Sequence, residues 1–89
     1  MYTAKMKTLA EIGQALAEKR KSLGLKQGQV AEHSGLSQAL LSRLERGQLT
    51  EFGSRKLLAL LAVLEMELAF TEAGTAGNLD ELRRERGGA

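Results

Sequence analysis

Glycines at positions 24, 35 and 47 divide the first half of this chain into short segments, and each segment has the apolar spacing of a helix. A glycine just beyond a helical pattern is a stop signal, because it readily adopts the left-handed conformation that ends a helix. The 89 residues contain no proline, which would kink or end a helix, and no cysteine, so no disulfide can cross-link the segments. A chain of this length supports one hydrophobic core. We therefore expect a single small all-α domain of short helices joined by tight turns.

The first helix is predicted over residues 9–23. Thr8 occupies the N-cap position with Glu11 three residues later, the pattern of a capping box. Leucine and isoleucine side chains then recur at helical spacing on one side until Gly24. A later helix is predicted over residues 51–64. It is apolar over so much of its circumference that we expect it in the core and at an interface between two copies.

Residues 27–46 form the segment that most clearly indicates a function. A helix is predicted over Gln27–Ser34 and a second one begins after an N-cap at Ser37 and ends at Gly47. Two short helices joined by a tight glycine turn form a helix-turn-helix motif, whose second helix enters the DNA major groove. The motif needs a small residue where the helices cross, here Ala31, and a turn residue, here Gly35. The apolar residues predicted to fill the wedge between the helices are Val30, Leu36, Leu41 and Leu44.

After residue 64 the apolar period changes from helical to alternating. Met66, Leu68 and Phe70 alternate with other residues, which predicts a β-strand with one apolar face. A lone strand has unpaired edges, so its expected partner is the same strand of a second copy, which favours a homodimer. The predicted organisation is a flexible basic arm over 1–7, the DNA-binding domain over 8–64, a C-terminal dimerisation strand over 65–73 and a flexible tail over 74–89.

Charge and composition narrow the function classes. Residues 1–26 carry six basic and two acidic side chains, whereas residues 57–89 carry three basic and six acidic ones, so a basic front is expected to face a polyanion. One histidine and one aspartate leave no support for catalysis, a metal site or a cofactor, and His33 is expected to be an ordinary surface residue. The longest apolar run, residues 57–64, is too short to span a bilayer. These features predict a cytoplasmic, non-enzymatic protein.

The segment 12–64 resembles the XRE family, the Cro and lambda-repressor type of helix-turn-helix domain. The likeness is carried by Ile12-Gly13, Gly24-Leu25-Lys26-Gln27, Val30-Ala31, Gly35-Leu36-Ser37-Gln38 and the run Leu41-Ser42-Arg43-Leu44-Glu45-Arg46-Gly47. The resemblance implies a compact four- or five-helix bundle that binds operator DNA as a dimer, with a structural ion pair between Arg20 and Glu45. One departure is Ser34, which stands where the family often has an apolar residue and is expected to loosen the wedge. The predicted strand is similar to that of HipB-like antitoxins in the family.

The predicted DNA-contacting residues are Gln27, Ser37, Gln38, Ala39, Ser42, Arg43 and Arg46. All except Gln27 project from the side of the second motif helix opposite its leucines. Gln38 can form a bidentate pair with adenine, and Ala39 can touch a thymine methyl. Arg43 can reach guanine or a phosphate, and Arg46 a phosphate. Gln27 lies at a helix N-terminus that suits a phosphate, and the resemblance implies that it also supports Gln38.

Together these observations predict a sequence-specific transcriptional regulator, a repressor that binds an inverted-repeat operator in double-stranded DNA as a homodimer. The alternative is the antitoxin of a type II toxin–antitoxin module, which binds a toxin protein and represses its own operon. The acidic back half and loose tail favour the antitoxin.

Overall fold

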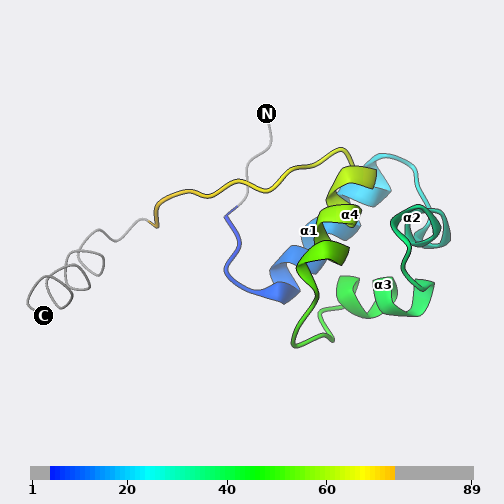
Figure 1. Cartoon of the computed structure of the whole chain (residues 1–89), viewed down its shortest axis with the longest axis horizontal. Coiled ribbons are helices and arrows are strands. Elements are labelled where there is room, and N and C mark those ends of the chain that lie inside the picture. The colour runs from blue at the N-terminus through cyan, green and yellow to red at the C-terminus, as the bar shows by residue number, and fades with distance from the viewer. Residues whose placement is uncertain (1–4, 74–89) are drawn as a thin grey trace, which may run out of the picture.

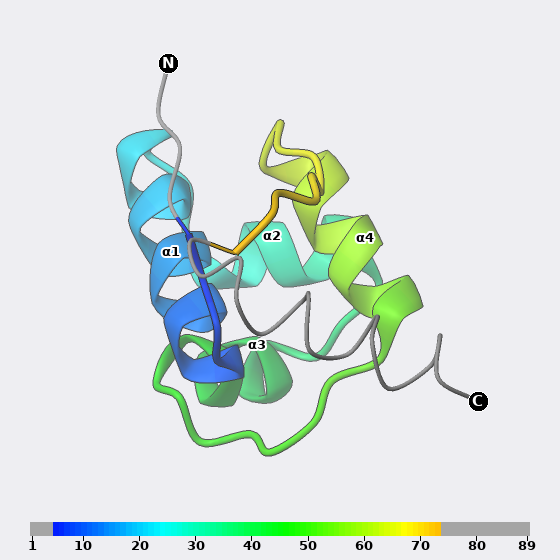
Figure 2. The same ribbon diagram turned by 90° about the vertical axis from the view of Figure 1, so that its left-hand side faces the viewer.

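The computed structural model describes residues 5–73, which contain four helices (Figure 1). They are α1 (Leu9–Ser22), α2 (Gln27–Ser34), α3 (Gln38–Glu45) and α4 (Ser54–Val63). Helix α3 packs against both α1 and α2, and α2 packs against α4. Seen from the side, α2 lies across the space between α1 and α4, with α3 beneath (Figure 2). The predicted all-α fold is confirmed for the described part of the chain.

The helix ends follow the capping signals in the sequence. The Thr8 hydroxyl accepts a hydrogen bond from the backbone N–H of Glu11 at 3.1 Å, and the Ser37 hydroxyl accepts one from Leu40 at 3.1 Å. Each bond satisfies one of the N–H groups that a helix start leaves without a partner. Gly35 follows α2 with a φ of 73°, a conformation that is costly for a residue with a side chain. Its N–H and that of Leu36 donate to the last turn of α2, which closes the turn before α3.

All four helices contribute to the core, in which leucine is the commonest residue. The buried apolar residues are Leu16, Val30, Ala31, Leu36, Leu41, Leu44, Leu60, Leu61 and Leu64. The predicted wedge residues are all among them, and Ala31 is 2% exposed between the helices of the motif. The motif therefore places α3 with its leucines inward, which leaves the opposite side of the helix for other contacts.

The last helix begins later than its apolar pattern predicts. We expected a start at residue 51, but α4 begins at Ser54, and Gly53 before it is extended with ψ at 139°. Residues 48–53 form a connection without helix or strand, in which Leu49 and Phe52 pack against the core. The apolar pattern extends into this connection because its side chains also reach the core. The predicted boundary was therefore wrong by three residues.

Residues 65–73 contain no assigned strand within the described part of this single chain. The segment runs away from the helices in Figure 1. Glu65 ends α4 with a φ of 58°, and the Met66 N–H then donates to the Leu61 carbonyl at 2.8 Å. A strand that pairs only with a second copy has no partner within one chain, so the predicted dimerisation strand stays a prediction. Most of the predicted arm, residues 1–4, and the whole predicted tail lie outside the described residues.

Gly13 is needed where α1 crosses α3. A Cβ at this buried position would overlap the carbonyl oxygen of Leu44 and lie 2.9 Å from its carbonyl carbon. Both atoms belong to the backbone, so no side-chain rotation can relieve the overlap. The absence of a Cβ therefore sets how closely α1 and α3 approach.

We expect Gly13→Ala to destabilise the fold by about 1 to 3 kcal/mol, because the helices must separate and their packing must loosen. The change opposes helix propensity, which favours alanine over glycine by roughly 1 kcal/mol. The control is Gly28→Ala in α2, where the new Cβ would lie 3.5 Å from Gln38 Oε1, an ordinary contact. Urea denaturation of both variants measures the difference. Equal stability of the two would show that α1 and α3 can adjust freely.

Candidate nucleic-acid interface

The side of α3 that faces away from the core carries the predicted DNA-contacting residues. Gln38, Ala39, Arg43 and Arg46 are exposed and Ser42 is half-buried, whereas Leu41 and Leu44 on the other side are buried. The one acidic residue of α3, Glu45, turns inward, and its side chain is only 6% exposed. The exposed side therefore presents two guanidinium groups, an amide and no carboxylate, a combination suited to phosphates and base edges.

The side chain of Gln38, the first residue of α3, reaches the start of α2. A Cβ at Gly28 would be 3.5 Å from the Oε1 atom of Gln38, so the Gln38 side chain lies along the first turn of α2. Gln27 precedes Gly28, so the Gln38 side chain ends one residue away from Gln27 in the sequence of α2. The α2 start has no hydrogen bond from a side chain to its free N–H groups, although the Lys26 N–H donates to Gln29 Oε1 at 2.9 Å. Such a helix start can accept a phosphate.

The polar residues that flank α3, Ser37 at its start and Arg46 at its end, are held by local hydrogen bonds. Ser37 caps the helix through its hydroxyl oxygen, which leaves its hydrogen free to donate outward. The Nε of Arg46 donates to the carbonyl oxygen of Ser42 at 3.3 Å, which keeps the guanidinium near the last turn of α3. Arg46 follows Gln38 by eight residues, or about 12 Å along a helix axis. The predicted contacts are therefore spread over the whole length of α3.

An ion pair joins α1 to α3, as the family resemblance implied. Arg20 Nε donates to Glu45 Oε2 at 2.7 Å and Arg20 Nη2 donates to Glu45 Oε1 at 2.9 Å. The third Arg20 nitrogen, Nη1, donates to the Leu25 carbonyl at 2.9 Å in the connection between α1 and α2. The side chains of Arg20 and Glu45 are 9% and 6% exposed. The pair is therefore almost sealed from water, and each charge depends on the other.

Gln27 also bonds to this pair. Its Nε2 donates to Glu45 Oε1 at 2.8 Å. Burial on its own would raise the pKa of Glu45, but hydrogen bonds from Arg20 and Gln27, with the positive charges of Arg20 and Lys21, hold that pKa below its ordinary value. The hydrogen bond from Arg20 to Glu45 in turn raises the pKa of Arg20 against the opposing effect of burial. The carboxylate is thus held in its ionised form by three hydrogen bonds.

Two expectations about neighbouring residues have different outcomes. The Ser34 hydroxyl donates to the Val30 carbonyl at 2.6 Å, so this polar residue is satisfied within its own helix rather than left without a partner in the wedge. The support of Gln38 by Gln27 that the family resemblance implied stays a prediction, and the structure adds a contact that was not expected, from Gln27 Nε2 to Glu45. The Gln27 contact was missed because the first residue of α2 and the last of α3 meet only after the motif folds, and no spacing rule signals that meeting.

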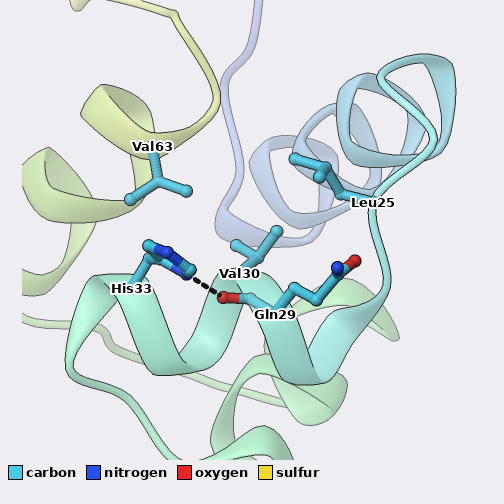
Figure 3. Close-up of a pocket in the computed structure, with 5 residues that line it drawn as sticks. All are labelled: Leu25, Gln29, Val30, His33 and Val63. Atoms are coloured by element: carbon cyan, nitrogen blue, oxygen red, sulfur yellow. Dashed lines mark hydrogen bonds between the residues drawn. The ribbon is translucent and has the colours of Figure 1, made fainter.

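A shallow groove of about 230 Å³ lies between α2 and α4 (Figure 3). It is lined by Leu25, Gln29, Val30, His33 and Val63. His33 Nδ1 lies 2.8 Å from the carbonyl oxygen of Gln29 in the preceding turn, and the residue is exposed, as expected for a surface histidine.

Among the described residues, no three histidine, aspartate or glutamate side chains gather as metal ligands. None of the helices described here has the length and apolar character needed to cross a membrane.

Comparison with known families agrees with this geometry. A family model described as a helix-turn-helix domain matches residues 2–71 of the chain. The chain belongs to the helix-turn-helix family. The match includes α1 to α4 and most of the segment that follows. The motif that α2 and α3 form is thus the one that gives the family its name. The comparison with curated proteins gives no match.

Solved structures support the same assignment. The restriction-modification controller protein C.AhdI from Aeromonas hydrophila is 36% identical, with a TM-score of 0.62 over 66% of this chain and 88% of that chain. The structure of a HipA-HipB-O2-O3 complex matches at 20% identity and a TM-score of 0.71, covering 80% of this chain and 99% of the matched chain. A HipB-O4 20mer complex matches at 21% identity and a TM-score of 0.72 with the same coverage. The HipB structures show a shared fold, and C.AhdI shows sequence similarity as well.

We expect Glu45→Ala to destabilise the helix-turn-helix domain by about 3 to 5 kcal/mol, because it leaves Arg20 buried without its counter-ion. The double variant with Arg20→Ala should lose less than the sum of the two single losses, since the pair is removed together. Glu32→Ala, an exposed glutamate of α2, is the control and should change stability by less than about 0.5 kcal/mol. Denaturant melts of the wild type, the two single variants, the double variant and the Glu32→Ala control measure these differences.

The ion pair also sets the pH dependence of stability. Because the pKa of Glu45 is lower in the folded state than in the unfolded chain, its contribution is complete above the unfolded-state pKa. That contribution declines as the pH falls through the folded-state pKa. Acid titration of the free energy of unfolding should show a steeper loss for the wild type than for Glu45→Ala. Parallel acid profiles would contradict the assignment.

Proposed function

We propose that this protein is a sequence-specific DNA-binding transcriptional regulator, a repressor that binds an inverted-repeat operator as a dimer. The observation that carries the proposal is the exposed side of α3, where Gln38, Arg43 and Arg46 are displayed without any acidic neighbour on that helix. Similarity to a restriction-modification controller protein at 36% identity supports a regulatory role. The proposal assigns no catalytic residue and no cofactor, so the protein acts by binding.

The residues divide into base contacts and phosphate contacts. In the first turn of α3, Gln38 pairs with adenine N6 and N7 and Ala39 contacts a thymine methyl. Arg43, one turn further, reaches guanine O6 and N7 or a phosphate. Phosphates are bound by Arg46 and by the hydroxyls of Ser37 and Ser42. Gln27 adds a phosphate contact at the start of α2.

The dimer is supported by the segment after α4. Phe70 is 92% exposed and Leu68 is 53% exposed, an unusual placement for large apolar side chains in a chain with only 3% aromatic residues. Leu58 on α4 is also 53% exposed. We propose that residues 65–73 pair with the same segment of a second copy and that this pairing sets the two α3 helices about 34 Å apart, one DNA turn.

The second candidate function is that of an antitoxin. It is favoured by the same exposed apolar residues together with Glu65, Glu67 and Glu72, which make residues 65–73 acidic as well as apolar. Such a segment suits a protein partner rather than DNA. The fold shared with HipB, which is solved in a complex with HipA, is consistent with this candidate. The two functions are compatible, because α3 would bind DNA while residues 65–73 would bind a protein.

We expect the protein to select a duplex with two half-sites from a pool of random sequences. Affinity should fall with salt at a log–log slope of about −0.9 for each phosphate neutralised. Titration of the selected duplex by fluorescence anisotropy at several salt concentrations measures the slope. An affinity that does not change with salt, or a pool that shows no enrichment, would exclude the proposed function.

Two variants separate sequence recognition from phosphate binding. Gln38→Ala should cost about 1 to 3 kcal/mol on the selected duplex and much less on a scrambled one, because only a base contact is lost. Arg46→Ala should weaken both duplexes alike and lower the salt slope by about 1. Circular dichroism must show that both variants are folded. Equal losses on both duplexes for Gln38→Ala would remove Gln38 from the set of base-reading residues.

The dimer has its own test. Phe70→Ser should shift the protein toward the monomer, because it places a polar side chain in the proposed apolar contact between copies. Ala69→Ser changes the neighbouring residue on the other side of the segment and should leave the dimer intact. Sedimentation equilibrium over a range of concentrations measures the association. A wild-type protein that is monomeric at every concentration would exclude the proposed dimer. The exposed apolar residues would then be expected to contact a different protein, as in the antitoxin candidate.

A further inference from the structure

Glu45 makes one contact more than its ion pair requires. The two carboxylate oxygens already receive Arg20 Nε and Nη2 at 2.7 Å and 2.9 Å. Oε1 receives a third hydrogen bond from Gln27 Nε2 at 2.8 Å. Gln27 is half-buried and is the first residue of α2, next to Gly28, which the Gln38 side chain approaches. The buried pair is therefore bonded directly to a residue of the proposed DNA interface.

The chemistry of this third bond determines how the Gln27 amide is turned. An ionised carboxylate can only accept hydrogen bonds, so the NH₂ end of the amide must face Glu45. This orientation fixes the positions of the two groups of the Gln27 amide that remain for other partners, its carbonyl oxygen and its second Nε2 hydrogen. A neutral amide in place of the carboxylate could donate as well as accept, and the Gln27 amide could then adopt either orientation.

We infer that Glu45 is a positioning residue for DNA binding, which fixes the Gln27 amide so that its free N–H is presented to a phosphate at the start of α2. The inference rests on the proposed function. It assigns Glu45 a second role besides stabilising the contact between α1 and α3. The same carboxylate thereby links the packing of the domain to the geometry of its interface.

The charge of Glu45 makes this role distinguishable from long-range electrostatics. Glu45→Gln removes one acidic group and changes the net charge from +2 to +3. A more positive protein attracts DNA more strongly, so electrostatics alone predicts tighter binding. Positioning predicts the opposite, because Gln27 loses its fixed orientation. The sign of the change in affinity decides between the two.

The experiment measures the affinity of the full chain for the selected duplex in Glu45→Gln, Gln27→Ala and the double variant. We expect each single change to weaken binding by about tenfold, the loss of roughly one hydrogen bond to a charged group. The double variant should be weakened by about tenfold as well, rather than by the hundredfold that independent effects would produce. The salt slope should stay the same, since a neutral amide releases no counterion.

Leu61→Ala is the matched control for lost stability. Leu61 is a buried residue of α4, a helix that carries none of the proposed DNA contacts, and its truncation should destabilise the fold without changing the affinity of the folded protein. Binding is compared at a temperature where circular dichroism shows every variant folded. If Glu45→Gln does not fold, two results remain to decide: the loss of affinity in Gln27→Ala, and solvent exchange of the side-chain amides by nitrogen-15 NMR. The Gln27 amide should exchange more slowly than that of Gln14, whose contact to Glu18 is exposed and 3.5 Å long.

Tighter binding by Glu45→Gln, additive losses in the double variant, or equal exchange of the two amides would each overturn the inference. So would an unchanged affinity in Gln27→Ala while Arg46→Ala still weakens binding, a result that leaves the DNA-binding function intact. Failure of the wild-type protein to bind any selected duplex is a different outcome, because it removes the proposed function and this inference with it.

Discussion

The buried ion pair between Arg20 and Glu45 is the interaction that holds the ends of three helices in register. Arg20 lies near the end of α1, Glu45 is the last residue of α3, and Arg20 also bonds the Leu25 carbonyl just before α2. Helices of eight residues have little stability of their own and depend on tertiary contacts. Apolar packing holds them together, but it is not directional and permits sliding. A sealed, bidentate pair is directional, and it defines one arrangement of the helices.

The short helix α3 has to satisfy three demands at once. Leu41 and Leu44 fill the core, Glu45 joins α1, and the remaining polar positions face outward. The helical period separates these groups around the axis of α3. Leu41 and Leu44, about one turn apart, are therefore enough to dock the helix. The close approach at Gly13 adds a backbone contact from α1 to the same helix. Docking of α3 is thus achieved with few side chains, and the rest of its surface remains available for recognition.

Local signals in the sequence predicted most of the helix boundaries. Thr8, Ser37 and Gly35 act through hydrogen bonds and backbone conformations within a few residues, so their effect can be deduced without the fold. The start of α4 could not be deduced in this way. Phe52 continues the apolar pattern although it lies in a loop, because a loop that crosses the core also buries side chains. The alternating residues after α4 predicted a strand, and residues 5–73 of one chain contain no neighbouring strand with which they could pair.

The all-α class, the helix-turn-helix motif and the outward side of α3 can be predicted from the residues, because these features depend on caps, glycine stops and apolar periodicity. The resemblance to the XRE family added the ion pair. Two other features are visible only in the folded chain: Gln27 bonds Glu45, and Gly13 must lack a Cβ. Both features join residues from different helices, and such contacts depend on the angle and distance at which the helices pack. No short-range pattern encodes that geometry, since it results from the packing of the whole core.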